Sequence, residues 1–112
     1  MKLAIIGGRD FNDTLLFLTT VQEFPNIEVV VSGGARGVDK LGELWANSQN
    51  IPTEIYYPDW DQYGKAAGFI RNKLIVENSD AVLAFWDGSS KGTKSSIDLA
   101  KKYNKKLTVV HY

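Results

Sequence analysis

The stretch Ser32-Gly33-Gly34-Ala35-Arg36-Gly37 follows a short β-branched run, Glu28–Val31, and precedes a segment with helical character, Val38–Asn47. Glycine permits sharp turns and lets backbone N–H groups approach a ligand closely. The N-terminus of the following helix favours an anion such as a phosphate. This order of strand, glycine-rich turn and helix predicts one unit of a parallel α/β sheet with an anion-binding loop.

Three further glycine-bearing loops occupy equivalent places in the chain. Two directly follow an apolar run, one follows its run after a short aromatic stretch, and each precedes a segment with helical character. They are Gly7-Gly8-Arg9-Asp10, Gly64-Lys65-Ala66-Ala67-Gly68 and Asp87-Gly88-Ser89-Ser90-Lys91-Gly92-Thr93. In an open parallel sheet, all such turns lie on the one edge where these folds bind ligands. The chain is therefore predicted to bind a nucleotide-like ligand at that edge.

Strands and helices alternate along the chain, which predicts right-handed crossovers. We expect a three-layer α/β/α, Rossmann-like sandwich with a five-stranded parallel sheet in the order 3-2-1-4-5 and a switch point between strands one and four. The expected strands are Leu3–Ile6, Glu28–Val31, Thr53–Tyr57, Ala81–Trp86 and Leu107–Val110. The expected helices are Asp13–Phe24, Val38–Asn47, Ala67–Glu77 and Lys94–Tyr103, and Asp59–Tyr63 is expected to be an aromatic connection.

Length and composition limit the number of domains and the kinds of site that the chain can contain. With 112 residues, 44% of them hydrophobic, we expect one domain, residues 1–112, with its own core. The absence of cysteine excludes disulfides and thiolate metal sites, and the single histidine, His111, argues against a histidine-dependent site. The apolar N-terminal run is too short for a signal peptide or a membrane span, so we expect a cytoplasmic protein. Thirteen basic and thirteen acidic residues cancel, which argues against nucleic acid as a partner.

Arg9, Arg36 and Arg71 stand in or just after the glycine loops, where each is a candidate partner for a phosphate. The alternatives are a pair with Asp10 for Arg9, and a solvent-exposed side chain for Arg71. The loops could instead be tight turns that pack helices on the sheet, with Thr93 as a helix cap. The proposed phosphate-binding or ligand-binding set is Gly8, Arg9, Ser32, Gly33, Gly34, Arg36, Gly37, Arg71, Gly88, Ser89, Ser90, Gly92 and Thr93. No metal and no cofactor are expected.

Carboxylates and aromatic rings beside the loops each have two interpretations. Asp10 and Asp39 are predicted to bind ribose hydroxyls or to brace the loops. Trp60 and Tyr63 are predicted to stack on a base, or else to cover an apolar sheet edge or a subunit interface. A group of lysines near the last helix is interpreted as solvated and complementary to the helix dipole, with nucleic-acid binding as the alternative. These are Lys101, Lys102, Lys105 and Lys106.

Four motifs taken together resemble a known family. They are G-G-R-D-F, S-G-G-A-R-G-V-D, P-x-W-x-x-Y-G-x-x-A-G-x-x-R-N and A-F-W-D-G-x-S-x-G-T, and they are similar to the small phage and bacterial proteins of the DUF2493 branch of the SLOG superfamily. The resemblance covers nearly the whole chain. It implies a Rossmann-like fold that senses, binds or processes nucleotide-derived ligands. The superfamily also includes the LOG-type phosphoribohydrolases and the DNA-processing protein DprA.

The chain departs from the LOG-type enzymes at one position. Those enzymes carry P-G-G-x-G-T-x-x-E, whose glutamate takes part in cleaving the N-glycosidic bond, and Ser96 stands in the glutamate position here. The resemblance implies that the phosphate-binding part, including Arg71, is retained. Asp10 and Asp87 are the candidate catalytic residues if an aspartate replaces the glutamate. The missing carboxylate argues against an enzyme.

The main prediction is therefore a protein that binds a nucleotide or an ADP-ribose-like ligand, as a sensor or a sequestering protein. A LOG-type nucleotide N-glycosidase or phosphoribohydrolase is the first alternative. Single-stranded DNA binding, which the distant resemblance to DprA suggests, is the second. Because LOG-type relatives form dimers, we also expect a homo-oligomer, with Ala67–Glu77 or Lys94–Tyr103 as the interface. The expected location is the cytoplasm of a bacterium or of an infected host cell.

Overall fold

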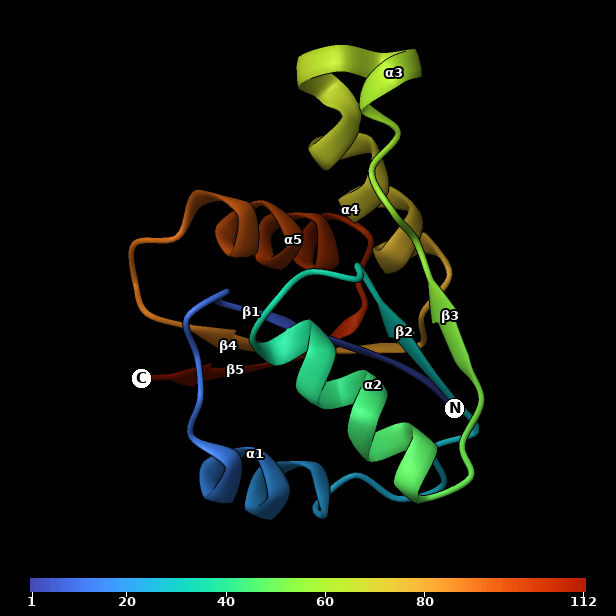
Figure 1. Ribbon diagram of the computed structural model, residues 1–112, viewed down its shortest axis with the longest axis vertical. Coiled ribbons are helices and arrows are strands. Elements are labelled where there is room, and N and C mark those ends of the chain that lie inside the picture. Colours follow the sequence, from blue (N-terminus) through green and yellow to red (C-terminus); the bar gives the residue numbers. More distant parts are fainter.

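Five parallel strands form one sheet in the order β3-β2-β1-β4-β5 (Figure 1). The structure is a computed structural model that describes residues 1–112. Its strands are β1 (Lys2–Gly7), β2 (Val29–Ser32), β3 (Thr53–Ile55), β4 (Ala81–Trp86) and β5 (Lys106–His111). The central pair is β1 and β4, whose register runs from Leu3 opposite Ala81 to Gly7 opposite Phe85. The predicted strand order is confirmed.

Helices cover both faces of the sheet, as the predicted three-layer, Rossmann-like sandwich requires (Figure 1). On one face lie α1 (Thr14–Val21) and α2 (Val38–Ser48), and on the other lie α4 (Ala67–Glu77) and α5 (Lys91–Lys102). A short helix, α3 (Trp60–Tyr63), and a 3-10 turn, η1 (Gly64–Ala66), protrude from the body before α4 begins. No helix has the length and apolar character that crossing a membrane would require.

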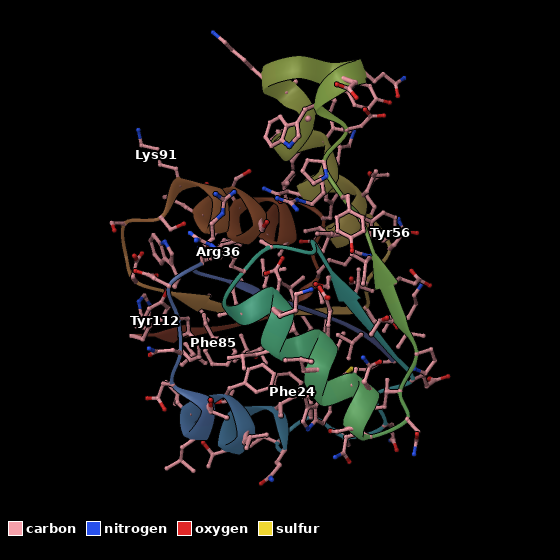
Figure 2. The ribbon with its side chains drawn as sticks, viewed as in Figure 1. Phe24, Arg36, Tyr56, Phe85, Lys91 and Tyr112 are labelled. Carbon is pink, nitrogen blue, oxygen red and sulfur yellow. The ribbon has the colours of Figure 1, made fainter.

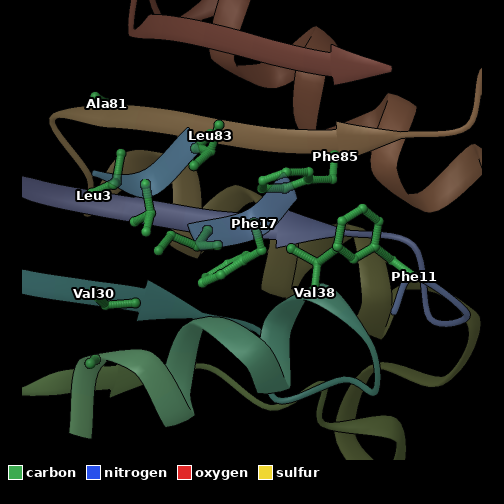
Figure 3. Close-up of a cluster of buried hydrophobic side chains, with 11 residues drawn as sticks. Leu3, Phe11, Phe17, Val30, Val38, Ala81, Leu83 and Phe85 are labelled. Atoms are coloured by element: carbon green, nitrogen blue, oxygen red, sulfur yellow. The ribbon is translucent and has the colours of Figure 1, made fainter. Parts of the chain in front are cut away.

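Alternate residues of the central strands serve two separate cores. In β1, Leu3 and Ile5 face α1 and α2, while Ala4 and Ile6 face α4 and α5. Because both faces are covered by helices, the strands are continuous apolar runs rather than alternating ones. Phe85 of β4 lies in the layer between the sheet and α1–α2 (Figure 2). Figure 3 shows this core, which we call the α1–α2 core.

Most element boundaries agree with the sequence-based expectation, and the exceptions have local causes. The first helix was expected to run to Phe24 but ends at Val21, before Asn26 adopts a positive φ of 56°. The connection expected between β3 and α4 contains helix α3, because the Asp59 carboxylate accepts the Gln62 N–H at 3.1 Å and caps it. Helix α5 begins at Lys91 rather than Lys94 because its preceding residue, a serine, acts as the N-cap.

Replacing Phe17 with alanine tests the α1–α2 core. Phe17 is 1% exposed and its ring lies 5.8 Å from that of Phe85, so truncation leaves a cavity between helix and sheet. We expect the free energy of unfolding to fall by about 3–5 kcal/mol in urea denaturation followed by circular dichroism. The matched control is Leu15→Ala on the same helix, where the side chain is 72% exposed and a change of about 0.5 kcal/mol or less is expected. Equal losses in the two variants would contradict this packing of α1.

Candidate functional site

The loops that follow β1 and β4 surround a cavity of about 370 Å³, which we call the inner cavity. It lies at the carboxyl ends of the two central strands, where the strand order changes direction and open parallel sheets bind ligands. The first turn of α5 contributes polar groups to its wall, and α4 contributes an arginine and an asparagine. The predicted site residues that line it are Gly8, Arg9, Asp10, Asp39, Arg71, Asp87, Ser90, Gly92 and Thr93.

A second hollow of about 290 Å³, the outer hollow, adjoins the inner cavity. The two share Arg9, Ala35 and Arg71 in their walls, so they form one continuous depression along the sheet edge. The loop after β2 contributes one more arginine and two glycines to the outer hollow. The segment between β3 and α4 contributes two aromatic residues and a proline. These are Arg36, Gly33, Gly34, Tyr57, Trp60 and Pro58.

Arg71 stands where the two hollows meet, and hydrogen bonds fix its orientation. Its Nη1 donates to the Gly33 carbonyl at 2.6 Å and its Nε donates to Asn72 Oδ1 at 3.0 Å. Burial lowers the pKa of Arg71, as does the positive charge of Arg9, while the carboxylate of Asp39 raises it. An arginine nevertheless stays protonated in proteins. The result is a positive charge held in place in the shared wall of the two hollows.

Asp39, at the start of α2, stabilises the glycine loop after β2 by hydrogen bonds to its backbone. Its Oδ2 accepts the N–H of Gly33 at 3.1 Å and that of Ala35 at 3.4 Å. Burial raises the pKa of Asp39 to about 6, against the lowering effect of these N–H groups and of Arg71. The Asp39 carboxylate therefore already accepts hydrogen bonds from backbone amides that the sequence predicts to bind a phosphate. Any contact of Asp39 with a ribose stays a prediction.

The loop between β4 and α5 is organised by Asp87. Its Oδ1 accepts the N–H groups of Ser89 and Ser90 at 2.9 and 2.8 Å, and these bonds lower the pKa of Asp87. Ser90 caps α5, because its Oγ accepts the Thr93 N–H at 3.5 Å. The carboxylate proposed as a catalytic candidate thus holds the loop in shape, and its role toward any substrate is untested.

Some predicted residues lie outside both hollows. Ser32 is buried and its hydroxyl donates to Glu43 at 2.7 Å. Gly37 has a φ of 74° and packs against the backbone of the first loop, so it serves the close approach of two loops. Three others are exposed and line neither hollow: Gly88, Ser89 and Tyr63. No group of three or more His, Asp or Glu side chains comes together as a metal-ion site would need.

Three polar side chains outside the predicted site set also line the hollows. Asn72 is buried in the wall of the inner cavity, and its Nδ2 donates to the Gly92 carbonyl at 3.4 Å, which joins α4 to α5. Ser96, the residue at the LOG-type glutamate position, is 2% exposed and lines the same cavity. Tyr57 is 66% exposed beside Trp60 in the wall of the outer hollow. The signal for Asn72 was its place directly after Arg71 in the quoted motif.

Comparison with known proteins assigns the family. The model of the YspA, cpYpsA-related SLOG family matches residues 1–63, which is more than half of the chain. The chain belongs to this SLOG family. Gene 61 protein of Mycobacterium phage D29 is 39% identical over 111 residues, covering 90% of this SLOG chain and 89% of the phage protein. The resemblance to the SLOG superfamily is therefore confirmed.

A solved structure extends the comparison of this SLOG fold. DNA processing protein A from Helicobacter pylori, whose structure concerns its single-stranded DNA binding mode, matches with a TM-score of 0.76 at 28% identity. The match covers 97% of this chain and 64% of the neighbour, so the chain spans less than two thirds of that protein.

This similarity overturns two predictions. The main prediction, a nucleotide or ADP-ribose-like ligand, is contradicted because the neighbour binds single-stranded DNA, which favours the second alternative. The prediction that nucleic acid is an unlikely partner is wrong for the same reason. Net charge does not predict nucleic-acid binding here because it sums over the whole chain, whereas binding depends on how charge is distributed. Arg9, Arg36 and Arg71 gather at one edge although the total charge is zero.

The raised pKa of Asp39 predicts how stability depends on pH. A carboxyl with a pKa of 3.8 when unfolded and about 6 when folded binds its proton more tightly in the native state. Its contribution to stability is therefore greatest below pH 3.8 and is lost as the pH rises to about 6. The loss amounts to about 3 kcal/mol.

The Asp39→Asn variant removes this titration and serves as the reference. Urea unfolding of both proteins between pH 4 and 7 measures the difference in their free energies of unfolding. We expect the native protein to lose stability relative to the variant as the pH rises, with no further change above about pH 7. A difference that does not depend on pH would contradict the assigned burial of this carboxyl.

Proposed function

We propose that this protein binds single-stranded DNA along the sheet edge formed by the inner cavity and the outer hollow. The observation that carries the proposal is the match over 97% of the chain to DNA processing protein A, which binds single-stranded DNA. The chemistry of the depression supports it. Proteins that bind single strands combine a basic groove for the backbone with aromatic rings for the bases.

In this proposal the arginines bind the phosphates of the DNA backbone. Arg9 and Arg71 lie where the two hollows join, and Arg36 extends the positive charge along the outer hollow. Guanidinium groups form paired hydrogen bonds to phosphate oxygens, and Arg71 is held in position before the DNA arrives. Three charge contacts would make binding salt-dependent, because each neutralised phosphate releases a counterion.

Aromatic side chains supply the preference for a single strand. Tyr57 and Trp60 are 66% and 56% exposed beside the outer hollow, although burial of rings of this size would be favourable. Unpaired bases stack on such rings, whereas the bases of a duplex already stack on one another. We assign Trp60 and Tyr57 to base stacking.

The inner cavity suits a base better than a phosphate. Carboxylates of Asp10, Asp39 and Asp87 line it and would repel a phosphate, but they accept hydrogen bonds from the N–H groups of bases. Asn72 and Thr93 add groups that both donate and accept. The strand is therefore placed with its backbone on the arginine side and one base directed inward. We expect this binding to take place in the cytoplasm of a bacterium or of an infected cell.

Substitution of Arg71 and Trp60 tests this proposal by fluorescence anisotropy with a labelled oligothymidylate of about 20 nucleotides. Arg71→Gln is expected to weaken binding about tenfold or more and to reduce the slope of log K against log salt by about 0.7. Trp60→Ala is expected to weaken binding about tenfold without changing the free energy of unfolding, because its side chain is exposed.

Lys73→Gln is the matched control, since Lys73 is an exposed cation on the same helix that lines neither hollow. It should bind within about twofold of the native protein. The proposal is wrong if the native protein shows no salt-dependent binding, or if it binds duplex DNA as tightly as the single strand.

A further inference from the structure

A third depression lies between α4 and α5, outside the inner cavity and the outer hollow. Its volume is about 450 Å³, and we call it the α4–α5 groove. Phe69 of α4 forms one wall, and the other wall comes from α5. The α5 side chains that matter for its charge are Lys91, Lys94, Asp98 and Lys102.

The groove carries an excess of positive charge. Its one carboxylate, Asp98, accepts from Lys94 Nζ at 2.9 and 3.2 Å and forms an ion pair with it. Lys91 and Lys102 form no ion pair with any carboxylate of the chain. Figure 2 shows Lys91 extending away from the start of α5. Two unpaired cations at opposite ends of one helix leave the groove suited to a polyanion.

The groove also exposes an aromatic ring. Phe69 is 55% exposed although buried Leu99 also lines the groove, so one face of the ring stays open beside the lysines of α5. A ring between cations repeats the combination found in the outer hollow, where Trp60 and Tyr57 lie beside arginines. This combination is the one that binds unpaired nucleotides.

The groove and the inner cavity lie on either side of the first turn of α5. Ser90, Gly92 and Thr93 line the inner cavity, while Lys91 and Lys94 of the same turn line the groove. A chain that crosses this turn from the inner cavity would therefore reach the groove. Helix α5 has 12 residues and is about 18 Å long, which gives room for more than one nucleotide along it.

We propose that the α4–α5 groove is a second contact surface for the same single-stranded DNA, occupied by the part of the strand that leaves the inner cavity. The inference rests on the proposed function and deepens it, because it makes affinity depend on the length of the strand. Short oligonucleotides are held by the sheet edge alone. Longer ones gain phosphate contacts with Lys91 and Lys102 and a stacking contact with Phe69.

The test compares oligothymidylates of about 4 and about 20 nucleotides with the native protein, with Phe69→Ala and with the double variant Lys91→Gln/Lys102→Gln. We expect the double variant to bind the long strand about tenfold more weakly and to lower its salt slope by about 1.4, which is 0.7 for each lysine. Phe69→Ala should weaken the long strand by a similar factor. Neither change should affect the short strand by more than about twofold.

The control Lys73→Gln/Lys106→Gln removes the same charge from exposed lysines outside the groove. It should leave both affinities within about twofold of the native values. Because Phe69 and the lysines are exposed, their variants should unfold at the same urea concentration as the native protein.

Three outcomes would overturn the inference. Long-strand binding that survives in both groove variants, with short-strand binding intact, removes the groove from the DNA path but leaves the proposed function in place. No binding of either strand by the native protein removes both. A native dimer in light scattering that Phe69→Ala converts to a monomer assigns the groove to a second copy of this chain, in line with the homo-oligomer predicted from the sequence.

Discussion

Burial of β1 and β4 on both faces is the constraint on which the rest of the structure depends. Leu3 to Ile5 and Val82 to Phe85 have no exposed surface, so neither strand can carry a polar side chain in this buried stretch. Polar chemistry is then possible only where the strands end. Each strand is followed by a glycine loop and a helix, and the parallel arrangement brings these loops to one edge. The core thereby decides where the site lies.

At that edge, Gly33 connects the loop after β2 to both Arg71 and Asp39. A side chain at this position would come within 2.7 Å of Arg71 Nη1 and 2.8 Å of Asp39 Oδ2. The absence of a side chain lets Arg71 reach the Gly33 carbonyl while Asp39 holds the loop from the other side. The buried carboxylate of Asp39 and the half-buried guanidinium of Arg71 thus both hydrogen-bond to the backbone of Gly33. Arg71 is presented to the depression at a fixed place, which reduces the entropy that a ligand must remove on binding.

Much of the fold could be predicted from the sequence, because its signals are local. The apolar runs, their spacing and the glycines after them predict the strands, the three layers and the edge of the sheet at which the site lies. Helix α3 was missed, since four residues are too few for a helical period and its cap at Asp59 depends on a single side-chain bond. The exposure of Tyr57 and the position of Asn72 depend on how distant segments pack, which no local pattern contains.

The ligand class was the largest error, and its cause is physical. A formal net charge of zero describes the electric field far from the protein, whereas a strand bound at this edge would interact with the arginines at contact distance. Lys101, Lys102, Lys105 and Lys106 were interpreted as solvated, with nucleic-acid binding as the alternative. In the structure, Lys91 and Lys102 lie in a groove with Phe69, an arrangement that depends on the packing of α4 against α5.

The most direct test of the sheet edge as the DNA site is a titration of the ¹⁵N-labelled protein with oligothymidylate, followed by amide and indole NMR shifts. If the edge binds the strand, the largest shifts occur in the loops at residues 8–10, 33–36 and 87–93 and at the indole of Trp60. These shifts should reverse when salt is added. Shifts confined to α1 and the outer surface of α2, or no shifts at low salt, would contradict the assignment of the edge.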